Sequence, residues 1–324
     1  MTHESLPPAS PEGYPVYQEA AAVPPLRYYV PVRPRFQDRV WKHVLLLALT
    51  LCTTTLVGVD YYGSFLSQVG QRRLAPELSL LWGGFWYSLP VLLILGAHEM
   101  GHYLCCRYYN LDASLPFFLP LPLQPTGTLG AVIKIREAFP GRKALFDIAV
   151  AGPVGGFVVL VPLLFWGMSL SNVQPVPPDM HGYALGEPLL FKLATWLKFG
   201  HIPDGSSVNI HPVVFAAWFG MLATAWNLLP FGQLDGGHLT YATLGDRSKY
   251  FSLATVAASI AMCFITYSWV VMTLMMVTML VLLGPRHPRV IDEYEPLGAA
   301  RIALALFALV MFILCFTPVP IDPM

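Results

Sequence analysis

Two short motifs carry the side chains of this chain that are best suited to chemistry. The first is an H-E-x-x-H pattern formed by His98, Glu99 and His102 inside an apolar stretch. On a helix, positions i and i+4 share a face, so both imidazoles can reach one metal ion. Glu99 then lies beside that ion, where its carboxylate can hold and deprotonate a water. Zinc lowers the pKa of such a water to about 7, so the pattern predicts hydrolysis at neutral pH.

The second motif supplies the ligand that the first one lacks. Catalytic zinc takes three protein ligands and a water, and two histidines leave one place open. The stretch NLLPFGQLDGGH contains Asp235, one of very few carboxylates near an apolar run. Pro230 and the glycines around Asp235 would break the helix and let this carboxylate turn inward. We therefore predict that His98, His102 and Asp235 bind one Zn²⁺ per chain; the alternative is that Asp235 caps a helix.

Several other polar residues near these motifs have two possible roles each. Asn227 lies before the break, and its amide can donate to a developing oxyanion or to a substrate backbone; the alternative is an interhelical hydrogen bond. His238 either supports Asp235 or lies in a surface loop, and we favour the loop. Asp147 either caps the start of its helix or orients neighbouring residues, and we favour the cap. The remaining histidines are expected at solvent or interfaces, and they are His43, His181, His201, His211 and His287.

The composition describes the elements that must position these residues. The chain has 324 residues, of which 55% are hydrophobic and 12% charged, with 19 basic and 19 acidic side chains. Zero net charge argues against a protein that binds nucleic acid through bulk positive charge, and against a disordered polyelectrolyte. The five cysteines lie in apolar runs without a disulfide pattern, so we expect them to be reduced. Long apolar runs at this low charge favour an integral membrane protein over a soluble globule.

A membrane-spanning helix needs about 20 mostly apolar residues. Seven segments fit, with the run 250–283 divided at Tyr267 and Ser268: residues 43–59, 78–106, 144–170, 212–229, two spans within 250–283, and 299–316. Pro90 is a point where the second span is prone to break. Gly152, Pro153, Gly155 and Gly156 in the third span are expected to permit close helix packing. The predicted fold is an all-α polytopic membrane protein with about seven transmembrane helices.

Basic residues orient these spans, because cytoplasmic flanks are rich in Lys and Arg. With the N-terminus in the cytoplasm, fifteen of the nineteen basic residues lie inside, and the four outside are Arg72, Arg73, Lys192 and Lys198. A six-span chain would instead place Arg286 and Arg289 outside. In the seven-span arrangement His98, His102 and Asp235 all fall at cytoplasmic helix ends. The charge bias therefore brings the predicted ligands to the same leaflet.

Two connecting segments are expected to have structure of their own. Residues 111–140 are apolar and rich in Pro and Gly, with alternation in AVIKIR, which predicts a loop dipping into the bilayer followed by a short strand. Within the external stretch 171–211, EPLLFKLATWLKFGH has apolar residues at helical spacing opposite Lys192 and Lys198. That pattern is typical of an interfacial helix.

The motifs together resemble the site-2 protease family of intramembrane zinc metalloproteases. HEMGH and NLLPFGQLDGG match the two family motifs, H-E-x-x-H and N-x-x-P-x-x-x-x-D-G, over a core of residues 78–237. FDIAVAGPVGGF extends the match, and weaker similarity in PTGTLGAVIKIRE and GPRHPRVIDEYEPLG points to the branch with plant plastid members and their bacterial relatives. The resemblance implies that His98, His102 and Asp235 bind zinc, that Glu99 is the general base, and that Asn227 assists.

From these observations we predict an intramembrane zinc endopeptidase that cleaves within or near transmembrane segments, as in regulated intramembrane proteolysis. Its expected partners are membrane-protein substrates and the lipid bilayer, with no nucleic acid; the sequence carries no signal for an oligomeric state. The expected location is a bacterial cytoplasmic membrane, with the N-terminus and the active site at the cytoplasmic side. The expected organisation is a disordered Pro-rich tail (1–40), a membrane-embedded metalloprotease domain (41–317) and a C-terminal tail (318–324). The alternatives are a zinc transporter or channel, or a catalytically silent relative that binds membrane helices.

Overall fold

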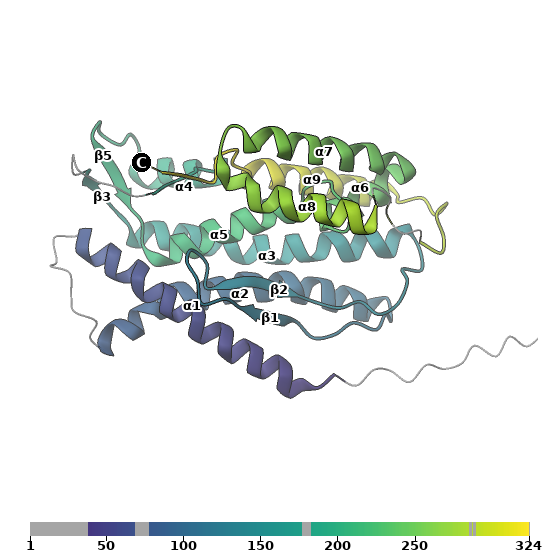
Figure 1. Cartoon of the computed structure of the whole chain (residues 1–324), viewed down its shortest axis with the longest axis horizontal. Helices are drawn as coiled ribbons and strands as arrows, with labels where there is room; N and C mark the ends of the chain where they lie inside the picture. Colours follow the sequence, from purple (N-terminus) through teal and green to yellow (C-terminus); the bar gives the residue numbers. More distant parts are fainter. Residues whose placement is uncertain (1–37, 69–77, 177–182, 285–286, 288–289, 324) are drawn as a thin grey trace, which may run out of the picture. The chain divides into compact units, whose positions relative to one another are not determined.

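Apolar helices dominate the structure because a helix satisfies its own backbone hydrogen bonds without water. The computed structural model describes residues 38–68, 78–176, 183–284, 287 and 290–323 (Figure 1). Most of the expected N-terminal tail lies outside these residues, and 37–324 form one compact unit. The α-helices in the described part are α1 (Val40–Gln68), α2 (Leu78–Tyr108), α3 (Arg142–Leu170), α4 (Leu189–Phe199), α5 (Pro212–Asn227), α6 (Asp235–Leu244), α7 (Ser248–Cys263), α8 (Val270–Leu283) and α9 (Ala299–Cys315).

The helices follow the predicted segments closely. The run 250–283 is divided as expected, because the 3₁₀ turn η2 (Tyr267–Trp269) separates α7 from α8, and the short turn η1 (Gly245–Arg247) separates α6 from α7. The expected break at Pro90 is absent, since α2 continues through it. Three helices, α1, α2 and α3, are long and apolar enough to cross a membrane, whereas α8 and α9 are shorter apolar helices. The count of seven spans therefore stays a prediction.

Short strands form three antiparallel pairs in the described residues. They are β1 (Phe117–Pro120) with β2 (Thr128–Val132), β3 (Asn172–Pro175) with β5 (Ser206–Asn209), and β4 (Tyr183–Leu185) with β6 (Ile321–Pro323). The expectation of a loop followed by one strand in 111–140 was incomplete. Phe117–Pro120 forms a second strand, because pairing with Thr128–Val132 satisfies backbone groups that an apolar loop would leave unpaired.

Helices α2 and α3 form the centre of the molecule, and small residues let them approach closely (Figure 1). A Cβ at Gly101 would collide with the backbone of Ala151, and one at Gly155 would lie 2.7 Å from the carbonyl oxygen of Ala97. The predicted packing role of the third-span glycines is confirmed by these contacts. Helix α5 packs on both α2 and α3, and its Trp218 is fully buried in their shared core.

Within the residues that the structure describes, the outer faces of several helices carry apolar side chains that other parts of the protein do not cover. On α8, Val271 is 79% exposed, Val281 77% and Leu282 75%. Exposed apolar surface of this extent is costly in water and marks contact with another apolar phase. The pattern is typical of helices that face lipid.

Candidate metal centre

Helix α2 presents both histidines of the H-E-x-x-H motif to α3 and α6. The Nδ1 atom of His102 lies 2.7 Å from the carbonyl oxygen of Ile148 on α3, which fixes the ring and leaves Nε2 next to Asp235 and His98. Gly152 makes this possible, because a Cβ there would overlap the His102 ring. Gly156 faces His98 in the same way, with a Cβ position 3.3 Å from the Cβ of His98. The small residues of α3 therefore form the cradle of the two imidazoles.

Asp235 reaches the same place through a reversal of the chain between α5 and α6. Helix α5 ends at Asn227, and Gly232 takes a φ of 52°, which favours glycine. Asp235 is the first residue of α6. A Cβ at Gly236 would collide with the carbonyl group of Leu228, so only a glycine allows this tight return. The break predicted around Asp235 is thus present, and it directs the carboxylate back towards α2.

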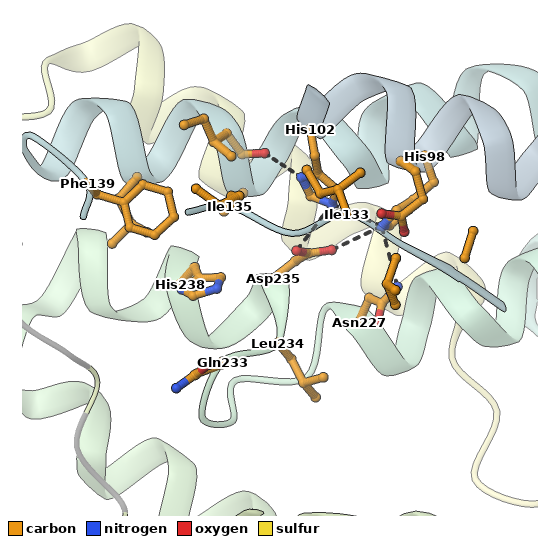
Figure 2. A pocket seen from close by; sticks show the side chains of 16 residues that line it. His98, His102, Ile133, Ile135, Phe139, Asn227, Gln233, Leu234, Asp235 and His238 are labelled. Carbon is orange, nitrogen blue, oxygen red and sulfur yellow. Dashed lines mark hydrogen bonds and ion pairs between the residues drawn. The ribbon is translucent and has the colours of Figure 1, made fainter. Parts of the chain in front are cut away.

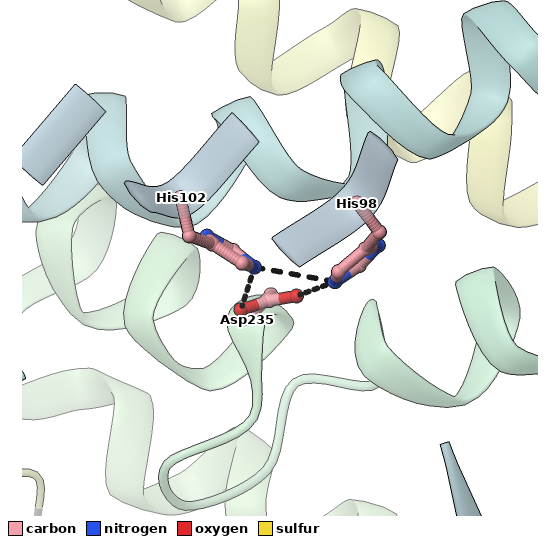
Figure 3. Close-up of side chains that lie close together, drawn as sticks. All are labelled: His98, His102 and Asp235. Carbon is pink, nitrogen blue, oxygen red and sulfur yellow. Dashed lines mark hydrogen bonds and ion pairs between the residues drawn. The ribbon is translucent and has the colours of Figure 1, made fainter. Parts of the chain in front are cut away.

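The three predicted ligands meet at one point (Figure 3). Asp235 Oδ2 lies 3.2 Å from His98 Nε2, Asp235 Oδ1 lies 3.4 Å from His102 Nε2, and the two Nε2 atoms are 3.2 Å apart. Ligands that sit about 2.0–2.1 Å from a tetrahedral zinc are separated by about 3.3 Å. Both imidazoles are buried and 7% exposed. Two imidazole nitrogens and a carboxylate whose two oxygens lie this close to them fit a zinc ion that keeps one further position open.

Glu99 and Asn227 border the same point. Glu99 is buried on α2, and the backbone N–H of Ile133, just after β2, interacts with its carboxylate. The amide nitrogen Nδ2 of Asn227 lies 3.4 Å from Nε2 of His98. The alternative predicted for Asn227 was a hydrogen bond to a neighbouring helix. The residue that it contacts on that helix is His98, so the contact and a place at the candidate metal centre are compatible.

A cavity of about 250 Å³ opens over this cluster (Figure 2). Its polar wall consists of His98, Glu99, His102, Asn227, Gln233, Asp235 and His238. Its apolar wall comes from the end of β2 and the segment after it, and from α3 and Leu234: Ala131, Val132, Ile133, Ile135, Phe139, Leu145, Ile148, Ala149 and Leu234. The charged groups thus lie beside an apolar slot that borders an extended strand.

His238 is the residue that the sequence interpretation misplaced. It is not in a surface loop but on α6, where it lines the cavity, and its Nδ1 lies 2.5 Å from Nε2 of His287. The available signal was its spacing, since residues i and i+3 of a helix share a face and Asp235 is three positions earlier. The sequence indicated that the helix before Asp235 ends, but it did not indicate at which residue the next helix begins. The face shared by Asp235 and His238 could therefore not be assigned.

Two further histidines and one aspartate also differ from expectation. His43 and His211, which were expected at solvent or at interfaces, are buried in the structure: the ring of His43 packs on Phe117 at 4.0 Å, and His211 caps the start of α5. Burial without a partner charge lowers the pKa of His211 to about 4. Asp147 does not cap α3, because that helix begins at Arg142.

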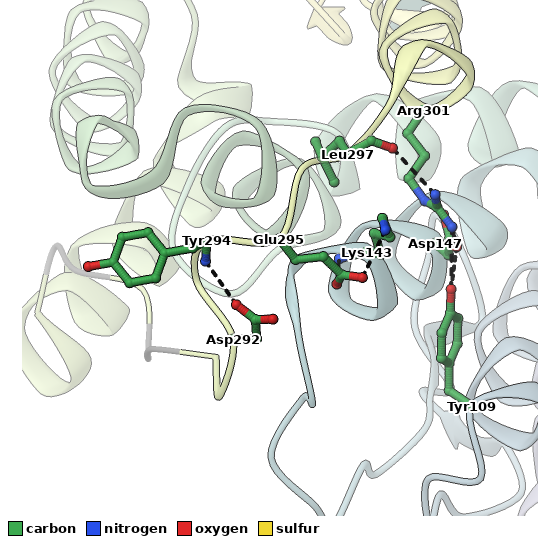
Figure 4. Close-up of polar contacts among 8 residues, drawn as sticks. All are labelled: Tyr109, Lys143, Asp147, Asp292, Tyr294, Glu295, Leu297 and Arg301. Atoms are coloured by element: carbon green, nitrogen blue, oxygen red, sulfur yellow. Dashed lines mark hydrogen bonds and ion pairs between the residues drawn. The ribbon is translucent and has the colours of Figure 1, made fainter.

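Asp147 instead links α3 to α9 and to Tyr109, the residue directly after α2 (Figure 4). Arg301 of α9 donates to both of its carboxylate oxygens, at 2.8 and 2.6 Å, and the Tyr109 hydroxyl donates to it at 2.6 Å. Burial, together with the hydrogen bond to Asp147, raises the pKa of Tyr109 to about 12. Because Asp147 precedes Ile148, whose carbonyl contacts His102, this cluster holds the part of α3 that orients a predicted ligand.

Comparison with known proteins assigns this arrangement to a family. The model of peptidase family M50 matches residues 86–268, more than half of the chain, including both motifs. The chain belongs to peptidase family M50. This membership confirms the resemblance to the site-2 protease family and classes the chain as a metalloendopeptidase.

Relatives that match include plant proteins named as probable zinc metalloproteases. The probable zinc metalloprotease EGY2, chloroplastic, of Oryza sativa subsp. indica is 30% identical over 262 residues, covering 76% of this chain and 45% of the relative. The probable zinc metalloprotease EGY1, chloroplastic, of Arabidopsis thaliana is 30% identical over 241 residues, covering 67% and 42%. The chain thus spans less than half the length of these relatives. No solved structure matches it.

Proposed function

We propose that this M50 protein is an intramembrane zinc endopeptidase that hydrolyses peptide bonds within or near transmembrane segments of other membrane proteins. The observation that carries the proposal is the convergence of His98, His102 and Asp235, whose ligand atoms all lie within 4.8 Å of one another. They line a cavity bordered by an extended strand and enclosed by apolar helices. Ligands clustered at one end of their helices suit hydrolysis better than ion conduction, which needs a track across the bilayer.

His98, His102 and Asp235 would hold one zinc ion per chain. When bound, zinc would supply a Lewis acid that polarises the scissile carbonyl and acidifies the attacking water. Glu99 accepts the proton of that water and passes it to the leaving amine, as a general base and then a general acid. Asn227 donates its amide N–H to the oxyanion or to the substrate backbone. Glu99 is buried beside His98, His102 and Asp235, so its carboxylate lies close to the groups that would hold the zinc.

The edge of β2 suits the binding of an extended substrate. Among the described strands β2 pairs only with β1, and Ala131, Val132 and Ile133 border the cavity along its other edge. A transmembrane helix hides its carbonyl groups, so a substrate must unwind before attack. Addition of the unwound segment to β2 satisfies its backbone groups and presents a peptide bond to Glu99.

The proposed location is a bacterial cytoplasmic membrane, with the N-terminus and the active site at the cytoplasmic side. The pairing of β4 with β6 supports an odd number of spans, because it joins the loop after α3 to the end of the chain after α9. The turn between α7 and α8 lies on the same side, since Trp269 donates to the carbonyl oxygen of Pro318 at 2.7 Å. With seven spans, the loop after α3, the turn between α7 and α8, and the segment after α9 all lie outside. With six spans, the segment after α9 would lie on the other side of the membrane from the loop after α3.

The test is cleavage of a single-span reporter protein by the purified enzyme in proteoliposomes. We expect the wild type to cleave and Glu99→Gln to lose at least about 100-fold in kcat, the range for removal of a general base. The matched control is Glu187→Gln, the same chemical change at an exposed site after β4, which is expected to cleave like the wild type. Equal cleavage by wild type and Glu99→Gln removes Glu99 as the base, and zinc flux without cleavage supports the transporter alternative.

A further inference from the structure

The proposed mechanism leaves two polar residues of the cavity without a task, Gln233 and His238, and His238 is the one whose contacts fix its orientation. His238 lies on α6 three residues after Asp235, so both side chains project from the same face of the helix. Figure 2 shows its ring between Phe139 and Asp235, whereas Asn227 lies on the other side of Asp235, next to His98. Two groups that can donate hydrogen bonds thus flank the candidate metal centre from opposite sides.

The orientation of the His238 ring is set by contacts outside the centre. Its Nδ1 lies 2.5 Å from Nε2 of His287, and the His287 ring is stacked on Tyr241 at 4.3 Å between centroids. The Tyr241 hydroxyl in turn donates to Glu293 at 2.9 Å. Because Nδ1 is engaged by His287, the geometry of the imidazole ring directs Nε2 to the opposite side, towards the cavity that His238 lines.

The contact with His287 allows a proton on that Nε2 atom. Burial and the neighbouring His287 lower the pKa of His238 to about 4, so the imidazole is neutral at pH 7. A neutral imidazole carries one proton and is a donor at one nitrogen and an acceptor at the other. The contact of Nδ1 with Nε2 of His287 is satisfied when the proton of His238 is on Nε2 and His287 is the donor. Nδ1 then accepts from His287, and Nε2–H is free to donate to a substrate.

We propose that His238 is a further catalytic residue: its Nε2–H donates a hydrogen bond to the carbonyl oxygen of the scissile peptide bond as that oxygen gains negative charge. The inference rests on the proposed peptidase function and adds a second donor to it. An oxyanion accepts several hydrogen bonds, so donors from His238 and Asn227 are compatible. His238 carries no proton to or from the substrate, and Glu99 keeps that task.

Three substitutions separate this role from a structural one. In His238→Gln the amide nitrogen is as many bonds from Cα as Nε2, so a donor towards the cavity remains. In His238→Asn the amide group matches Nδ1 instead, which keeps the contact to His287 and removes the donor. His238→Phe keeps a ring for packing on Phe139 and provides no donor.

The measurements are reporter cleavage, zinc content, and affinity for a phosphinic peptide whose tetrahedral centre mimics the charged intermediate. We expect kcat to fall about 100-fold or more in His238→Asn and His238→Phe, the usual effect of removing an oxyanion donor, and less than about 10-fold in His238→Gln. Affinity for the phosphinic peptide should fall in parallel. Binding of the uncleaved reporter, measured in a Glu99→Gln background, and one zinc per chain should be retained.

Three outcomes would overturn the inference. They are wild-type kcat in His238→Phe, equal losses in His238→Asn and His238→Gln, and loss of zinc from these variants, which would make His238 a support of the metal. If His238→Phe does not fold, the comparison of Asn with Gln still decides. Failure of the peptidase proposal is distinguishable, since the wild type would then not cleave or would cleave as well as Glu99→Gln.

Discussion

A methyl group at position 152 is expected to expel His102 from the metal centre. A Cβ on Gly152 would lie 2.5 Å from Cδ2 of the His102 ring, and two other atoms of that ring would lie closer still. Carbon atoms pack at about 3.5–4.0 Å, so the ring must move by about 1 Å. The backbones of α2 and α3 are already in contact at the residues directly before His102 and Gly152, since a Cβ on Gly101 would collide with the backbone of Ala151, so any room must come from the ring.

The size of the effect follows from what the ring loses. Rotation away from Gly152 breaks the 2.7 Å contact of His102 Nδ1 with the carbonyl oxygen of Ile148, worth about 1 kcal/mol, and an off-rotamer ring costs about 1 kcal/mol more. A fold with about 5–15 kcal/mol of stability survives this loss. Metal-ligand distances, however, tolerate only about 0.2 Å. Zinc affinity should therefore fall by more than about 100-fold, beyond the effect of removing an outer support.

The assay is zinc content by mass spectrometry after dialysis against buffered free zinc, together with reporter cleavage and thermal unfolding in detergent. Gly152→Ala is expected to unfold cooperatively but to hold little zinc. The matched control is Gly63→Ala on α1, where nothing lies within 4 Å of the new Cβ; it should keep zinc and gain up to about 1 kcal/mol in helix stability. Wild-type zinc affinity and cleavage in Gly152→Ala would refute the packing argument.

Three other predictions concern the metal, the strand and the ion pairs. A chelator of zinc should abolish cleavage, and Zn²⁺ but not Mg²⁺ should restore it, because imidazole ligands suit zinc better than a hard cation; full activity in chelator would contradict this. Arg136→Gln removes hydrogen-bond donors to two carboxylates, and these bonds anchor the segment after β2. The KM for the reporter should therefore rise several-fold while the zinc content stays unchanged. An unaltered KM would count against substrate binding at β2. Asp147→Asn should lower the unfolding free energy by about 1–3 kcal/mol because Arg301 stays partly buried without its charge partner. The control Lys143→Gln, in a pair whose side chains are about one-third exposed, should cost less than about 1 kcal/mol, and equal melting temperatures for these two variants would contradict the distinction.

Local spacing made part of the centre predictable. His98 and His102 share a helix face whenever their segment is helical, and apolar length alone made that segment a helix. The division at Tyr267 was likewise predictable, because no single span needs the 34 residues from 250 to 283. These inferences need only the geometry of one helix, so a sequence is sufficient for them.

Other features depended on partners that are distant in sequence. The strand at Phe117–Pro120 exists because a second segment pairs with it, and the position of His238 follows from the register at which α6 begins. Asp147 resembled a helix cap until its partner Arg301, 154 residues later, was in place. A local sequence pattern does not predict these contacts, since each contact depends on which helix and strand surfaces meet in the folded protein.

The sequence by itself determined the residue types and periodicities: an apolar helical protein with two imidazoles on one helix face, a carboxylate after a helix break, and a base between the imidazoles. Only the tertiary structure decided that α3 would cradle both rings through Gly152 and Gly156, that Asp235 would return to within 3.4 Å of His102, and that His238 would border the same cavity. The physical reason is that helical periodicity is a local property, whereas convergence depends on close packing between helices, which every side chain at the contact must allow.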